Sequence, residues 1–154
     1  MIIIYLMVEV VHNYFEDIYI DMTLLNSTAK QAGIVEYYIP ISNSVTTESS
    51  SVWTRIGSIH FVPTKFWSRF VGKLEVVMST SNVSVNAQAR LYNVTSNNIV
   101  NSVTITTNSI TSVAVLSSAL SDLNTNGDCI YELQIATATS TKPMTCSMGR
   151  LVFT

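Results

Sequence analysis

The chain has 154 residues, enough for one domain with a substantial core, and charged residues make up only 12% of it. An average globular protein is about a quarter charged, so this chain is unusually poor in charge. With a net charge of −2 and no basic cluster it lacks the Lys and Arg that neutralise phosphates, which argues against a nucleic-acid partner. A positive mean hydropathy with so little charge favours a permanently assembled protein, although an ordinary low-charge β-domain fits equally well.

Residues 1–11 form a strongly apolar run that Glu9 interrupts. No basic residue precedes the run and no small-residue cleavage site follows it, so we expect a soluble, unprocessed chain. The run is also shorter than the roughly 20 residues of a membrane-spanning helix. As a strand it would be apolar on both faces, which favours burial between subunits or against a shell over an internal strand. The predicted assembly contacts are Ile2, Ile3, Ile4, Tyr5, Leu6, Val8 and Val10.

The rest of the first third is less regular. Residues 15–22 alternate as a strand does, and residues 34–41 are strand-like up to Pro40. Residues 43–51 are a polar Ser/Thr/Val run, typical of a linker or long loop. We therefore predict two parts, with residues 1–51 as an N-terminal anchoring or oligomerisation segment of one or two strands and residues 52–154 as the main domain.

The main domain is predicted to consist of short strands separated by turns. In residues 86–93 small apolar side chains alternate with polar or aromatic ones, so Arg90 and Tyr92 share one face of a half-buried strand. No stretch shows sustained helical spacing, and we expect no helix. The predicted strands cover residues 52–62, 73–78, 86–93, 99–105, 110–116, 129–136 and 145–153.

Two cysteines, Cys129 and Cys146, fall in the last two predicted strands. Neither has the spacing of a metal-ligand motif. Two alternatives stay open: a cross-strand disulfide, if those strands are neighbours, or two buried free thiols.

Nothing in the sequence argues for catalysis or a metal. Residues 122–128 match the first half of a calcium loop, but the position that needs a carboxylate is Leu133, and strands flank the loop. We expect an ordinary strand connection there. His12 and His60 lack a nucleophile motif. The chain is therefore predicted not to be an enzyme, with no cofactor and no metal site.

Several aromatic residues suit stacking on sugar rings, although core packing is the commoner role of such residues. They are Trp53, Trp67, Tyr37, Tyr38 and Tyr92. On the hypothesis of a glycan-binding protein, the contacts are Trp53 and Trp67.

Three segments carry a likeness to a known module: RLYN within residues 89–95, YELQ within residues 129–135, and GRLVF at residues 149–153. Joined by a mid-domain strand that ends in small residues, they resemble the jelly-roll module of bacteriophage virion proteins. Those proteins include capsid decoration and head-fibre proteins, and the likeness to carbohydrate-binding modules is looser. The resemblance implies an all-β fold, a jelly-roll-like antiparallel β-sandwich with an N-terminal extension.

The resemblance also implies a function. It suggests an auxiliary, decoration or head-fibre component on the capsid surface of a tailed phage, with no chemistry of its own. Its partners would be the major capsid protein and further copies of itself, a trimer being one candidate, with no membrane. The alternative is an extracellular carbohydrate-binding module that adheres to glycans or host surfaces. Fold alone does not decide between them.

Overall fold

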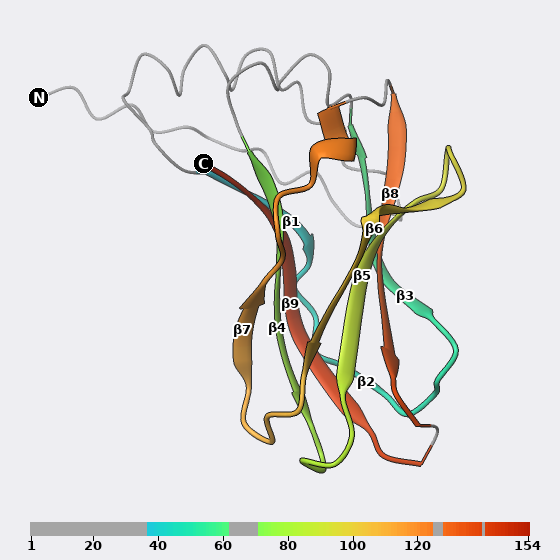
Figure 1. Cartoon of the computed structure of the whole chain (residues 1–154), viewed down its shortest axis with the longest axis vertical. Coiled ribbons are helices and arrows are strands. Elements are labelled where there is room, and N and C mark those ends of the chain that lie inside the picture. The colour runs from blue at the N-terminus through green and yellow to red at the C-terminus, as the bar shows by residue number, and fades with distance from the viewer. Residues whose placement is uncertain (1–36, 62–70, 125–127, 140) are drawn as a thin grey trace, which may run out of the picture.

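The computed structural model describes residues 37–61, 71–124, 128–139 and 141–154, which form a sandwich of two antiparallel sheets (Figure 1). The described part contains no α-helix, only the short 3₁₀ helix η2 (Ser121–Asn124). Within this part, no helix reaches the length and apolarity needed to cross a membrane. The predicted all-β, jelly-roll-like class is confirmed.

The first sheet has the strand order β1-β9-β4-β7, and β2 also pairs with β9. Its strands are β1 (Tyr37–Ser42), β2 (Thr46–Glu48), β4 (Gly72–Thr80), β7 (Val113–Leu116) and β9 (Met144–Phe153). Figure 1 shows β9 beside β4 along the length of the sheet, and on its other side β9 pairs first with β2 and then with β1.

The second sheet has the order β3-β8-β5-β6. Its strands are β3 (Thr54–Phe61), β5 (Ala87–Asn93), β6 (Asn98–Thr107) and β8 (Cys129–Thr137). A register shift between Arg90 and Tyr92 on β5 lies opposite a bulge on β6, where Asn101 and Ser102 have positive φ angles of 53°.

The core lies between the sheets because the central strands alternate buried and half-buried residues. Burying each large aliphatic or aromatic side chain contributes about 1.5–3 kcal/mol to the free energy of unfolding. The inward residues of β4, β5, β8 and β9 include Leu74, Val76, Met78, Ala89, Leu91, Tyr131, Leu133, Ile135, Leu151 and Phe153.

The sandwich begins earlier than the sequence predicts. Both β1 and β2 pair with β9, so residues 37–48 belong to the sheet, and the predicted start of the sandwich at residue 52 is too late. The polar run that resembles a linker contains β2, because Thr suits an exposed strand next to a partner. Pro40 is tolerated inside β1 because β1 is an edge strand. Residues 1–36 lie outside the described part.

The two cysteines are free and buried. Cys129 lies on β8 and Cys146 on β9, and these strands belong to different sheets. Of the two alternatives, the pair of buried thiols is confirmed.

Candidate functional site

Most of the residues predicted to make contacts fall outside the described part of the chain. These are Ile2, Ile3, Ile4, Tyr5, Leu6, Val8, Val10 and Trp67. Trp53 is described. It immediately precedes β3 and is half-buried.

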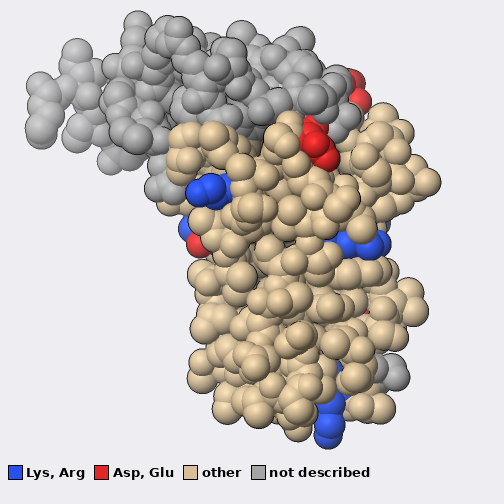
Figure 2. Space-filling model, viewed as in Figure 1, with Lys and Arg blue, Asp and Glu red and all other residues tan. Residues whose placement is uncertain are grey.

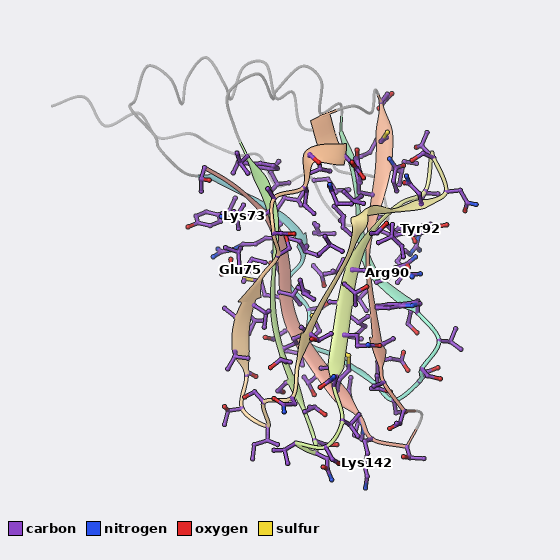
Figure 3. All side chains as sticks on the ribbon, viewed as in Figure 1. Lys73, Glu75, Arg90, Tyr92 and Lys142 are labelled. Atoms are coloured by element: carbon purple, nitrogen blue, oxygen red, sulfur yellow. The ribbon has the colours of Figure 1, made fainter. Side chains whose placement is uncertain are left out.

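Trp53 lies against Arg90 on the outer face of the second sheet. The Cζ atom of Arg90 is 4.1 Å from the centroid of the Trp53 ring and 5.5 Å from that of Tyr92. Arg90 and Tyr92 point away from the core because they alternate on β5 with buried residues. Figure 3 shows both side chains on the same side of β5, remote from Lys73 and Glu75 on the other sheet. We call Trp53, Arg90 and Tyr92 the arginine-aromatic platform.

A chain of polar contacts holds the Arg90 guanidinium in place. Its Nε donates to Oε1 of Gln134 at 2.9 Å, and Nε2 of Gln134 donates to Oε2 of Glu132 at 2.9 Å. Glu132 is in turn 3.5 Å from Nη1 of Arg55. Arg55, Gln134 and Arg90 pair in one row across β3, β8 and β5, so the sheet register creates this order.

Tyr92 is held by the β5–β6 hairpin. Its hydroxyl donates to Oδ1 of Asn97 at 2.5 Å, and Asn97 occupies the left-handed region with a φ of 55°. Asn tolerates that conformation better than most residues. The Tyr92 side chain is therefore held at its hydroxyl by this hydrogen bond, in addition to the strand pairing of its backbone.

Arg90 differs from the other described arginines in its partners. Arg55 pairs with Glu132, and Arg150 pairs with Glu75, but Arg90 pairs with the neutral Gln134. Burial lowers the pKa of Arg90 below its ordinary value, although a guanidinium stays charged in proteins. A partly desolvated cation thus lies on the sheet without a counter-charge of its own.

The outer face of the first sheet carries a patch of apolar residues around an ion pair, with Lys73, Ser79 and Thr145 on the same face. Tyr38 and Leu116 are 45% and 48% exposed there, and the Arg150–Glu75 ion pair, 2.5 Å between Nε and Oε2, lies between them in the sheet. The Arg150 guanidinium stacks 3.8 Å from the centroid of the Tyr38 ring. The strand pairing places six apolar residues on this surface, which we call the contact face: Tyr38, Pro40, Val77, Ala114, Leu116 and Met148.

Of the strand connection predicted at residues 122–128, the structure describes Asp122, which is bonded to strand β6. Oδ2 of Asp122 accepts the backbone N–H of Asn101 at 2.8 Å, while Oδ1 of Asn101 accepts the backbone N–H of Asp122 at 2.9 Å. Asp122 thereby secures the β6 bulge. Residues 125–127 lie outside the described part, and the residues that are described contain no group of three or more metal-ligating side chains.

The sequence identified two of the three platform residues, Trp53 and Tyr92, and missed Arg90. The available signal was the alternation in residues 86–93, which places Arg90 beside Tyr92 on one face. Its approach to Trp53 depends on β3 and β5 both pairing with β8, which no local pattern reveals.

No protein-family model matches the sequence, and neither does any curated protein. Solved structures do match by shape. The chain is similar to VP2 in the crystal structure of the infectious bursal disease virus subviral particle, with a TM-score of 0.50 and 14% identity over 77% of this chain. The T=1 particle derived from the same virus gives a TM-score of 0.47 at 14% identity, over 77% of this chain and 31% of that one. A family two carbohydrate esterase from Cellvibrio japonicus gives 0.35 at 11% identity, over 77% of this chain and 33% of that one.

The chain spans about a third of the length of the viral chains it matches, 32% for the subviral particle. The match to the subviral particle has a TM-score of 0.50, and at 14% identity it shows a shared fold alone. The β-sandwich of this protein therefore has the fold of part of a viral capsid protein.

Proposed function

We propose that this chain is a non-enzymatic structural protein of a virion, an auxiliary, decoration or head-fibre component of a tailed bacteriophage that binds the shell and itself. The observation that carries the proposal is the contact face on the first sheet. The fold likeness to VP2 from a virus particle agrees with it.

The contact face is unusual for an outer sheet surface. Antiparallel sheets that face water normally turn polar side chains outward. Here Tyr38 and Leu116 are about half exposed, and the register sets Val77 beside Ala114 and Met148. An exposed apolar surface with a polar rim is typical of a protein–protein contact.

The charges on this face do not oppose association. Glu75 and Arg150 already neutralise each other, while Lys73 lies on the same face near the start of β4, where its long side chain keeps the ammonium group in water. Interface cores are depleted in charged residues, and the two charges between the apolar residues of the contact face neutralise each other. Figure 2 shows the same scarcity over a wider area, since most of the described surface in that view carries neither Lys, Arg, Asp nor Glu.

The described carboxylates support a role without catalysis. Glu75 and Glu132 pair with arginines, and Asp128 lies 2.5 Å from Nε2 of His60. Asp122 binds the backbone of β6, and Glu48 accepts the backbone N–H groups of the two residues that follow it. General acid–base catalysis needs a carboxylate turned toward a substrate, and each of these already has a partner within the protein.

Light scattering on the full-length protein tests self-association. Substituting Leu116→Lys places a charge in the contact face and should lower the average mass in solution. Ile110→Lys is the matched control, because Ile110 is 62% exposed on the β6–β7 connection, away from that face. A monomeric wild-type protein, or equal effects of the two variants, would contradict the proposal.

The apolar N-terminal run is proposed as the anchor to the shell, with Ile2–Val10 as its contacts. Deleting residues 1–22 should give a soluble sandwich that no longer co-sediments with capsid shells made of the major capsid protein. Unchanged co-sedimentation would exclude the anchor.

Glycan binding is the second candidate function. The arginine-aromatic platform favours it, because aromatic rings with adjacent hydrogen-bonding groups match the apolar faces and hydroxyl edges of sugars. The platform lies on the sheet opposite the contact face, so one molecule has room for both roles.

A further inference from the structure

Arg90 has the features of an anion-binding residue, but no carboxylate in the described part of the protein binds it. Its guanidinium is held by contact with the Trp53 ring, by the nearby Tyr92 ring and by the Nε bond to Gln134. Its two terminal nitrogens make no hydrogen bond within the described part of the chain. A guanidinium held in this way has already lost most of its rotational freedom, and binding a carboxylate in a two-pronged manner costs it little further entropy.

The charge around Arg90 also favours an anion. The nearest carboxylate, Glu132, is occupied by Arg55 and by the amide of Gln134. Two arginines and one glutamate leave this part of the sheet with one net positive charge. Arg55 and Arg90 are separated by a single strand, which puts their backbones about 10 Å apart.

The aromatic rings distinguish a sugar from an acidic peptide. Both Trp53 and Tyr92 lie beside the guanidinium, and the indole N–H of Trp53 makes no hydrogen bond within the described residues. A pyranose offers C–H groups to the rings and hydroxyl oxygens to that N–H. On the neighbouring strand Thr104 pairs with Arg90 and presents an exposed hydroxyl, which extends the polar surface.

We propose that the arginine-aromatic platform binds an acidic saccharide, with the sugar carboxylate on Arg90 and the sugar ring against Trp53 and Tyr92. The inference goes beyond a role in assembly and gives the glycan-binding candidate a site and a ligand class. It locates recognition on the second sheet, and leaves the contact face of the first sheet to protein partners.

The test is a titration of the full-length protein with defined probes, followed by NMR or calorimetry. The acidic probes are 3′-sialyllactose and trigalacturonate, and the neutral probe is lactose, which equals sialyllactose without its acidic sugar. We expect an acidic probe to bind at least tenfold more tightly than lactose, with the affinity falling as salt is raised.

Variants locate the binding. Arg90→Gln and Trp53→Ala should each weaken acidic-probe binding by tenfold or more. The affinity of Arg90→Lys should lie between those of the wild type and Arg90→Gln, because Lys keeps the charge but loses the two-pronged guanidinium. Arg150→Gln is the matched control, since Arg150 also stacks on a tyrosine but lies on the opposite face. Circular dichroism checks the fold of each variant. If Arg90→Gln does not fold, the test relies on Trp53→Ala and Arg90→Lys.

Three results would overturn the proposal. The first is no binding of either acidic probe at millimolar concentration, and the second is an equal loss in Arg90→Gln and Arg150→Gln. The third is tighter binding of an aspartate-rich peptide than of the saccharides, which would identify an acidic protein segment as the ligand. Light scattering of Arg90→Gln keeps this test separate from the assembly proposal, because its mass should equal that of the wild type.

Discussion

Gly57 on β3 lies so close to Ile41 on β1 that a Cβ atom at position 57 would overlap the Ile41 carbonyl oxygen. Both strands are edges of their sheets, so this contact closes one side of the sandwich. A backbone oxygen in a paired strand has little room to move, and only a glycine fits against it.

Replacing this glycine should therefore be costly. We expect Gly57→Ala to lower the free energy of unfolding by about 1–3 kcal/mol through overpacking, measured by urea denaturation. Gly149→Ala is the matched control. A Cβ there would overlap the side-chain end of Leu133, which can rotate aside, so its loss should be smaller. A larger loss at position 149 would show that the β1–β3 contact is the more compliant one.

Ser42, beside Gly57, provides a second test of packing. It is 7% exposed, and its Oγ has no hydrogen-bond partner within the described residues. Because an unpaired buried hydroxyl costs free energy, Ser42→Ala should leave the stability unchanged or raise it by about 1 kcal/mol. Ser117, at 6% exposure, is the control: its Oγ accepts the Leu74 N–H at 2.9 Å. Ser117→Ala should cost about 1–3 kcal/mol. Similar effects of the two substitutions, in thermal or urea unfolding, would refute the distinction.

The strand alternation in the sequence predicts much of the fold. In residues 86–93 period two identifies both the strand and its inward face, because each buried residue there alternates with a half-buried one. The strand predicted from residue 110 begins only at Val113, since Ser109 and Thr111 hydrogen-bond each other in a turn. Such side-chain to backbone competition leaves no trace in the apolar pattern.

The pairing of strands cannot be predicted from the sequence alone. Local patterns do not tell which strands pair, so the sequence predicts a separate segment for the residues of β1 and β2, although both strands pair with β9. For the same reason the sequence does not predict the arginine-aromatic platform. Trp53 directly precedes β3 and Arg90 lies on β5, and β8 brings them together because it pairs with both strands. The sequence alone instead predicts Trp53 and Trp67 as the glycan contacts.

The thiols should be unreactive in the folded protein. Burial raises the pKa of Cys146 to about 11, because desolvation disfavours the thiolate. At pH 8 only about one such thiol in a thousand is ionised, and the buried Cys129 is shielded from the reagent. Ellman's reagent should react slowly with the native protein and detect two thiols per chain in denaturant without reductant. Fewer than two would indicate a disulfide.

The raised thiol pKa also affects stability. The unfolded chain releases the proton at its ordinary pKa of 9.0, while the folded chain keeps it until about 11. Stability is therefore fully present below pH 9 and falls as the pH rises between these values. Cys146→Ala should remove this alkaline loss, as seen in unfolding free energies at pH 8 and pH 10.5. An identical pH slope in the variant would contradict the assignment.

Glu48 predicts the opposite dependence on pH. The Thr54 hydroxyl and the backbone N–H of Ser50 lower the pKa of Glu48 below its ordinary value of 4.5. The stabilisation is present above pH 4.5 and is lost as the pH falls through the folded-state pKa. Glu48→Gln should be less stable than the wild type at pH 7, with the difference shrinking toward pH 3. Thr54→Ala should lose part of the same acid sensitivity, and a difference independent of pH would exclude the carboxylate as its source.

Strand β9 has a consequence for the order in which the protein is made. It pairs with β1, β2 and β4, so the first sheet has no centre until residues 144–153 have left the ribosome. Until then β1, β2 and β4 lack the strand they all pair with, and their backbone groups and apolar side chains stay exposed. Nascent chains in such a state are prone to aggregate. Pairing β1 with β9 also closes a loop of about a hundred residues, which makes folding slow. Protection by a chaperone during synthesis would suit such a chain.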